Sequence, residues 1–271
     1  MSTSHLQFTA RIEGSPETIF DLIADMPNYG RWLPGSEAFR GTTEESPYAV
    51  RRRESLGVQE DASHMTKLKL TYFDFHGGRG EPARLALSIA GIPFEDDRVQ
   101  FTDWERRKVD TPFGALPVLE VDGQILAQSN AINRYVGKLA SLYPSDPWQA
   151  ALCDEAMEAV EDITNKIAAT LFLPEEEKKT QRKALVEGPL PFYLNRLQQR
   201  LEAHGGRYFA ADRLTVADLK VFVWIRQLKS GVLDHVATDL PDRIAPKLVE
   251  HYERVKNERG VKAYYSKHGA G

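Results

Sequence analysis

The sequence has a single cysteine, Cys153, among its 271 residues. One thiol excludes an internal disulfide, a CxxC redox pair and any metal site built from several cysteines. The seven histidines are scattered and show no metal-ligand spacing. We therefore expect no metal site and assign the chain to a reducing compartment, the cytoplasm.

Long apolar runs and a large excess of one charge are also missing. No stretch of about 18 apolar residues is present, so no membrane-spanning helix is expected, and the N-terminus shows no secretion signal. The 35 Lys and Arg residues nearly balance the 39 Asp and Glu residues, and the triplet at residues 51–53 is the only basic run. Neither nucleic acid nor a membrane is an expected partner. With 42% hydrophobic and 27% charged residues, the chain has a globular composition and room for two domains.

Residues 1–64 differ from the remainder of the chain. They hold six Lys and Arg residues against ten Asp and Glu residues, whereas the remainder is neutral. The segment SPETIFDLIADM begins with Ser15 as an N-cap and Pro16 in the first turn, and NYGRWLPG then ends the predicted helix. Residues 6–50 resemble the start of a START/polyketide-cyclase helix-grip domain, without its curved sheet and long C-terminal helix. We expect an incomplete, poorly packed α+β fragment followed by a linker.

Residues 65–144 alternate between strand and helix patterns. KLKLTYFD and FEDDRVQ are predicted strands on either side of a helix in EPARLALSIAGI. LPVLEVDG and QILAQS are two short strands joined by an Asp122-Gly123 hairpin signal. NAINRYVGKLA follows as a helix, with Ser129 or Asn130 as its N-cap. This order predicts a small mixed sheet with helices packed on it.

Residues 145–271 carry almost only helical patterns. WQAALCDEAMEAVEDITNKIAATLFL is one long amphipathic run. In LTVADLKVFVWIRQL, Thr215 is followed three residues later by Asp218, which is a capping pair. The helix after this pair is apolar around most of its circumference, so we expect it at the centre of an all-helical domain.

The turn after the first of these strands carries two chemically notable residues. In LTYFDFHGGRGEPARL, Tyr72 stands at the end of the strand and Arg79 lies in a glycine-rich turn. Taken alone, this pattern fits a core tyrosine and a surface arginine as well as it fits a catalytic pair. The motifs that follow it along the chain favour the second interpretation.

Five motifs occur in a fixed order between residues 65 and 268: LTYFD…GRGEPARL, DW…K, PFGALPVLEVDG, QSNAINRYV and LTVADL. Together they resemble a cytosolic glutathione transferase of the sigma type, which is similar to glutathione-dependent prostaglandin synthases. The resemblance implies a thioredoxin-like α/β domain at 65–144 and an all-α domain at 145–271. It also implies a homodimeric enzyme that uses glutathione as co-substrate, needs no other cofactor and acts on hydrophobic electrophiles.

The resemblance assigns the catalytic role to Tyr72. A free thiol with a pKa of ~8.5 is only about 3% thiolate at pH 7. A phenol O–H that donates to the sulfur stabilises the thiolate and lowers the pKa of the thiol. Arg79 is expected to steady the tyrosine and the sulfur electrostatically. The turn HGGRGE is one residue longer than in the family, which leaves the reach of Arg79 open.

The remaining implied roles concern glutathione binding. Leu116, ahead of a cis Pro117, would pair its backbone with the cysteinyl part of the peptide, as an added strand does. Gln128 and Ser129 stand at a helix start, where free N–H groups and the helix dipole favour the γ-glutamyl carboxylate. A plain N-cap is the alternative role for Ser129.

Two further positions complete the implied site. Trp104 and Lys108 lie four residues apart and are expected to bind the glycyl end, with Lys108 pairing its carboxylate; packing and surface roles are the alternatives. Asp162 is expected to reach the γ-glutamyl amine in the neighbouring subunit of a dimer, and Glu161 beside it is the alternative.

Three functions stay open at this point. The chain could conjugate glutathione to electrophiles, isomerise a substrate such as a prostanoid with the same thiolate, or serve as a non-catalytic ligand carrier or crystallin-like protein. The complete set of glutathione-binding residues favours the two enzymes. A cysteine-based transferase or a thioredoxin-type redox protein is rejected because Cys153 lies in the helical region without a partner.

Removing residues 1–64 is expected to leave glutathione conjugation and the melting temperature of the remainder unchanged. The apolar residues of this fragment, such as Ile19, Phe20 and Trp32, lack a complete sheet to cover, so burial does not offset an ordering cost of about 1–2 kcal/mol per residue. Assays and melting curves of residues 65–271 beside the full chain test this, and trypsin should cut residues 51–64 first. Lost activity, or a melting temperature lower by several degrees, would instead show that the fragment packs on the transferase.

Overall fold

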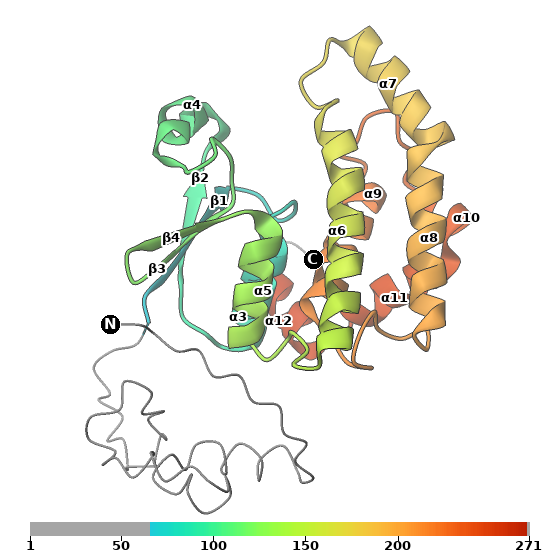
Figure 1. Cartoon of the computed structure of the whole chain (residues 1–271). Coiled ribbons are helices and arrows are strands. Elements are labelled where there is room, and N and C mark those ends of the chain that lie inside the picture. Colours follow the sequence, from blue (N-terminus) through green and yellow to red (C-terminus); the bar gives the residue numbers. More distant parts are fainter. Residues whose placement is uncertain (1–65, 270–271) are drawn as a thin grey trace, which may run out of the picture. The chain divides into compact units, whose positions relative to one another are not determined.

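The computed structural model describes residues 66–269 (Figure 1). The START-like fragment and linker predicted at residues 1–64 lie outside the described residues. Within the described part, a sheet with its own helices is followed by a group of helices, which is the predicted order of a thioredoxin-like domain and an all-α domain.

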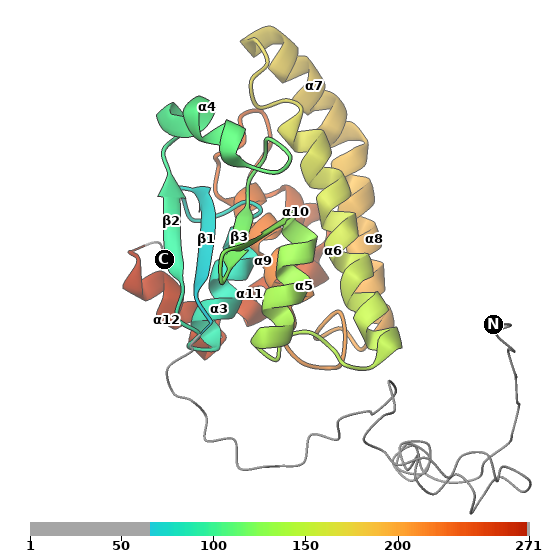
Figure 2. The same cartoon turned by 60° about the vertical axis from the view of Figure 1, so that its left-hand side comes forward.

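The sheet has four strands in the order β2-β1-β3-β4. Strand β1 pairs in parallel with β2 and antiparallel with β3, and β3 forms a hairpin with β4. Figure 2 shows β2, β1 and β3 side by side. The predicted mixed sheet is therefore confirmed, and its strands are β1 Leu68–Phe73, β2 Glu95–Val99, β3 Val118–Val121 and β4 Gln124–Ala127.

Two helices of the first domain separate the sheet from the second domain. Helices α3 (Glu81–Ile89) and α5 (Ser129–Leu139) contact each other, and α3 also packs on α9 (Val216–Lys229) of the second domain (Figure 1). The short helix α4 (Trp104–Arg107) follows β2 and has a single 3₁₀ turn at each end, Phe101–Asp103 and Lys108–Asp110. The C-terminal end of β1 thus leads, through one turn, into α3, a helix that contacts both domains.

The N-cap prediction for α5 is wrong. The helix begins at Ser129, so the residue in the N-cap position is Gln128, which has a left-handed φ of 75° and makes no side-chain capping bond. The Ser129 hydroxyl donates instead to a carboxylate of the second domain, 3.1 Å away. The Ser129 side chain therefore makes a tertiary contact instead of the local capping bond that the sequence pattern predicted.

The second domain is entirely helical among the described residues. The helix predicted at residues 148–173 ends at Ala168, and a separate helix begins after Pro174 with three glutamates in its first turn, where the helix dipole favours negative charge. No helix of residues 66–269 has the length and apolar character needed to cross a bilayer. The helices besides α9 are α6 Pro147–Ala168, α7 Glu175–Glu187, α8 Pro189–Ala203, α10 Leu240–Ile244, α11 Pro246–Lys256 and α12 Arg259–Lys267.

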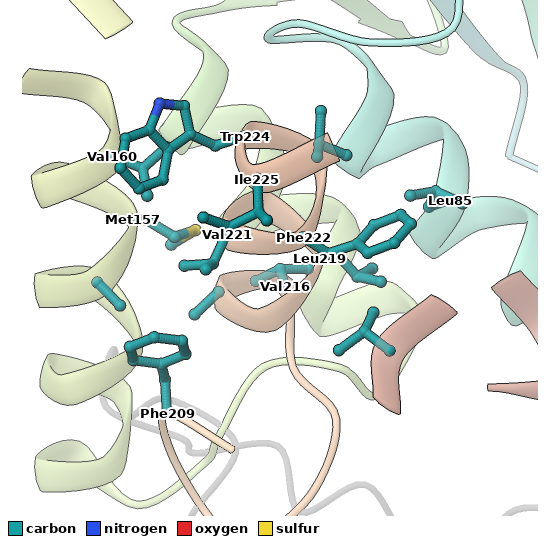
Figure 3. Packing of buried hydrophobic residues seen from close by; sticks show 14 of the residues in the cluster. Leu85, Met157, Val160, Phe209, Val216, Leu219, Val221, Phe222, Trp224 and Ile225 are labelled. Atoms are coloured by element: carbon teal, nitrogen blue, oxygen red, sulfur yellow. The ribbon is translucent and has the colours of Figure 1, made fainter. Parts of the chain in front are cut away.

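Helix α9 lies at the centre of the core, as predicted. Its apolar side chains extend toward α6 on one side and α3 on the other (Figure 3). The Thr215–Asp218 capping box is present: the Asp218 carboxylate accepts the backbone N–H of Thr215 at 2.8 Å and, with its other oxygen, that of Phe209 at 3.0 Å. Asp218 is fully buried, and His251 of α11 contacts it at 2.9 Å. The cap therefore joins α9 to two other parts of the domain.

The single cysteine lies in the same core. Cys153 of α6 is fully buried, and burial raises the pKa of its thiol to about 12. A thiol in this state carries no thiolate at neutral pH and is closed to solvent.

Candidate active site

Tyr72 occupies the end of β1, where the strand turns into α3. Its side chain is buried, and its hydroxyl oxygen accepts a hydrogen bond from the backbone N–H of Arg79 at 2.9 Å. Burial raises the pKa of Tyr72, and the Arg79 N–H opposes this effect. The phenol therefore keeps its proton at neutral pH. Among the described residues no acceptor is in place for that proton, so it is available to a ligand atom.

Arg84 of α3 holds the turn that covers Tyr72 by binding its carbonyl groups. Its guanidinium donates to the carbonyl oxygen of Phe73 at 3.2 Å and to that of Phe75 at 3.0 Å, and it lies 5.6 Å from the centre of the Tyr72 ring. Arg84 is itself fully buried and paired with Asp96 at 2.8 Å. An arginine with this many fixed partners gives the turn one conformation.

Glycines let this turn lie directly on the tyrosine. A Cβ atom at Gly78 would overlap the Tyr72 hydroxyl, and one at Gly80 would overlap the ring. Gly78 also has a φ of 65°, which side chains rarely adopt. The close approach of this turn to Tyr72 therefore requires glycine at both positions.

The Arg79 side chain joins a cluster of polar groups between the two domains. Its Nε donates to Glu161 Oε1 at 2.6 Å, and its other end donates to Asn165 at 2.8 Å. Glu161 Oε2 accepts from the Ser129 hydroxyl at 3.1 Å and from Lys220 Nζ at 2.6 Å. Burial alone would raise the pKa of Glu161, but Lys220 and Arg79 outweigh it and hold that pKa below its usual range. Arg79 thus hydrogen-bonds to Tyr72 through its backbone N–H, while its guanidinium pairs with Glu161 and its positive charge also opposes the rise in the Tyr72 pKa.

Several predicted residues gather around Tyr72. Leu116 is buried in the same small apolar cluster as Tyr72, and the half-buried Trp104 packs on its edge. The Leu116–Pro117 bond is cis, as the resemblance implies. The Trp104 ring stands edge-on to Phe73 at 5.4 Å. The structure therefore brings the end of β1, the start of α4 and the segment before β3 to one place.

The other predicted residues lie farther out. Gln128 is exposed at the start of α5, and Lys108 is exposed just after α4, with its side chain passing Gly114. Asp162 is exposed on a different face of α6 from Glu161 and accepts from the Tyr193 hydroxyl at 3.4 Å. Asp162 has no contact with Arg79 or Ser129 among the described residues, so its role across a dimer stays a prediction.

Two members of the interdomain cluster were not singled out from the sequence. Glu161 stood only as the alternative to Asp162, although it is the carboxylate that contacts Arg79 and Ser129. Lys220 was counted as part of a core helix. The signal in the sequence was a lysine inside the apolar run LKVFVWI, where a charge has to find a buried partner.

A cavity of about 440 Å³ opens next to the turn. Its walls come from the turn itself, from α9 and from α11, and apolar side chains such as Phe75, Val223 and Tyr252 form much of them. Gly78, which lies against the Tyr72 hydroxyl, also lines this cavity. Gly78 therefore connects the wall of the cavity with the Tyr72 hydroxyl.

Comparisons with known proteins identify the family of both domains. Residues 68–138 match the family model "Glutathione S-transferase, N-terminal domain", and residues 161–268 match "Glutathione S-transferase, C-terminal domain". The chain is 35% identical over 197 residues to glutathione S-transferase 1 of Ascaris suum, which covers 71% of this chain and 94% of that protein.

Solved structures show the same similarity. Prostaglandin synthase D of Nilaparvata lugens aligns with a TM-score of 0.67 and 33% identity, covering 74% of this chain and 98% of that one. The sigma class glutathione S-transferase of Fasciola hepatica aligns with a TM-score of 0.64 and 28% identity, covering 74% and 96%.

Substituting Gly78 by alanine is expected to lower turnover at least about tenfold, because the new methyl group displaces the Tyr72 hydroxyl by steric overlap. Gly91→Ala is the matched control: Gly91 has a φ of 66°, against 65° for Gly78, but nothing lies near its Cβ position. Both variants should lose about 1 kcal/mol or more of folding free energy from backbone strain, measured by urea unfolding. Equal turnover in the two variants would show that the turn does not set the position of Tyr72.

Proposed function

The chain belongs to the glutathione S-transferase family, and we propose that Tyr72 is the residue with which it activates the glutathione thiol. The reaction of this enzyme is the conjugation of glutathione, as thiolate, to electrophilic apolar compounds. Glutathione is a co-substrate, and the chemistry needs no other cofactor. The observation that carries the proposal is the hydroxyl of Tyr72, which is held by the Arg79 N–H at 2.9 Å while its own proton is uncommitted.

The proposed mechanism follows from the protonation states of the Tyr72 phenol and of the glutathione thiol. A phenol with a raised pKa keeps its proton and acts as a hydrogen-bond donor to sulfur, not as a base. The hydrogen bond that the phenol oxygen accepts from the backbone N–H of Arg79 polarises the phenol and strengthens its donation to the sulfur. The thiol proton leaves to solvent, the stabilised thiolate attacks the electrophilic carbon, a C–S bond forms, and the leaving group departs with its electron pair.

The peptide backbone of glutathione is proposed to lie between the start of α5 and the start of α4. Leu116 would pair with the cysteinyl part, Gln128 and Ser129 would take the γ-glutamyl end, and Trp104 with Lys108 the glycyl end. This is supported by the contact of Leu116 and Trp104 with the Tyr72 cluster and by the N-terminus of α5 beside Ser129. The electrophile would enter the cavity of about 440 Å³ beside Gly78.

Replacing Tyr72 by phenylalanine is expected to reduce turnover of a chlorinated nitroaromatic about 10- to 150-fold, which corresponds to losing a hydrogen bond to a charged group of about 1.5–3 kcal/mol. The KM for glutathione should change little, because peptide binding uses other groups. Lys108→Ala is the contrasting variant and should raise the KM for glutathione with a smaller change in kcat. A Tyr72→Phe enzyme with wild-type turnover would refute the assignment.

A glutathione-dependent isomerase is the second candidate function. It is favoured by the similarity to prostaglandin synthase D of Nilaparvata lugens, and it would use the same thiolate. Product analysis separates the two candidates, since conjugation consumes glutathione and isomerisation returns it unchanged.

We also propose that the enzyme is a homodimer. Asp162 lies on the exposed side of α6, away from Arg79 and Ser129 of its own chain, so a role for it in a glutathione site requires a second subunit. Large apolar side chains are exposed on the segment that carries Trp104 and Lys108: Phe101, Val109 and Phe113. Exposed apolar groups of this kind are typical of an interface.

Sedimentation velocity at micromolar concentration is expected to give a dimer, and Phe113→Ser should shift it toward monomer by removing apolar area from the interface. The shifted sample should also bind glutathione more weakly, because Asp162 would no longer be supplied from the second subunit. A fully active monomer would remove Asp162 from the site.

A further inference from the structure

Lys220 is a cation in the middle of the molecule's apolar core. Its neighbours on α9, Leu219 and Val221, are fully buried (Figure 3), and Lys220 itself is 5% exposed. Its Nζ donates to Glu161 Oε2 at 2.6 Å and to the side-chain oxygen of Asn130 in the first turn of α5. Burial lowers the pKa of Lys220, and Glu161 opposes that effect. Lysine is almost never this buried without a partner. The role of Lys220 therefore lies in its contacts with Glu161 and Asn130.

The cations around Lys220 are matched in number by carboxylates. Arg79 and Lys220 are two cations on one carboxylate, Glu161. Arg134 is one cation between two carboxylates, Glu158 at 2.6 Å and Asp154 at 2.7 Å, and Glu158 lies one turn before Glu161 on α6. The N-terminus of α5 adds the positive end of a helix dipole beside Ser129. A ligand carboxylate at Ser129 would therefore lie at this positive end and near the two cations that share Glu161.

The Ser129 hydroxyl has one proton, and that proton is donated to Glu161 Oε2 at 3.1 Å. While this bond exists, the hydroxyl cannot donate to a ligand carboxylate. The same Glu161 oxygen accepts Lys220 at 2.6 Å, which is the shorter, charge-assisted bond. Glu161 Oε2 thus keeps a strong donor when the Ser129 hydroxyl turns away.

We propose that Lys220 is a positioning residue for glutathione, which satisfies Glu161 so that the Ser129 hydroxyl is free to rotate onto the γ-glutamyl carboxylate. The inference rests on the proposed function, which places that carboxylate at the start of α5. The change is an exchange of hydrogen bonds: Ser129 gives up Glu161 for the ligand, Lys220 stays on Glu161, and the incoming carboxylate lies at the positive end of the α5 dipole. Without the lysine, Glu161 retains the serine proton and competes with the ligand for it.

Lys220→Met keeps an unbranched side chain that is one atom shorter and removes its charge. We expect the KM for glutathione to rise on the order of tenfold, while kcat at saturating glutathione stays within about threefold, since the loss occurs on binding. Lys220→Arg should stay within about threefold of the wild-type KM, because it keeps a donor for Glu161. Lys262→Met, an exposed position on α12, is the control and should leave both constants unchanged. A wild-type KM in Lys220→Met would overturn the proposal.

A double-mutant cycle tests whether Lys220 acts on glutathione binding through the Ser129 hydroxyl. In a Ser129→Ala background no hydroxyl is left to release, so Lys220→Met should change the KM by less than about twofold. The same factor in both backgrounds would mean that Lys220 acts without Ser129, which contradicts the proposal.

A second variant covers the case in which Lys220→Met folds poorly. Lys220→Met/Glu161→Gln removes both charges of the pair and leaves Arg79 with the amide oxygen of residue 161 and with Asn165 as acceptors. The neutral amide holds the Ser129 proton less firmly than the carboxylate does, so glutathione affinity should recover from the level of Lys220→Met toward wild type. A double variant as weak as Lys220→Met would overturn the proposal.

Titration calorimetry with S-hexylglutathione measures this affinity without turnover. The outcome is therefore distinct from a failure of the proposed function, which would show as full turnover in Tyr72→Phe.

Discussion

The carboxylate of Glu161 is the contact on which the arrangement of the site depends. It accepts from Arg79 of the turn, from Ser129 of α5 and from Lys220 of α9, and it stands on α6. Arg79 and Ser129 belong to the sheet domain, whereas Lys220 and Glu161 itself belong to the helical domain, so this carboxylate links the two domains at the site. Removing one partner of this half-buried group leaves the others with uncompensated charge, which destabilises the cluster. Tyr72 is held by the same arrangement, through the backbone of Arg79.

The sequence predicted features whose causes are local. The alternation in KLKLTYF, the hairpin signal at Asp122 and the Thr215–Asp218 cap all specify structure within a few residues, and each is present. Two side-chain contacts between parts distant in the chain, those of Ser129 and Lys220 with Glu161, were not predicted. Glu161 and Asp162 are adjacent and chemically alike, and only the packing of α6 against α5 and α9 decides which of them faces Arg79.

The turn after β1 shows why spacing alone did not settle the position of Arg79. An added residue need not displace a side chain if the backbone can fold back, and the left-handed φ of Gly78 permits this. Arg84 then fixes the turn by binding two of its carbonyl groups. The contact with Tyr72 is made by an amide, which every residue except proline can supply. The guanidinium of Arg79 is thereby free to join the two domains.

The burial of Cys153 has a consequence for an enzyme that handles reactive compounds. Substrates of this class alkylate thiolates indiscriminately, and a protein with an accessible thiolate would be consumed by the molecules it processes. With its only sulfhydryl group enclosed in α6 and its pKa raised to about 12, the protein offers these substrates no competing sulfur nucleophile. The reactive sulfur at the catalytic centre is then supplied by a peptide that is replaced at each turnover. The enzyme itself is therefore not alkylated at sulfur.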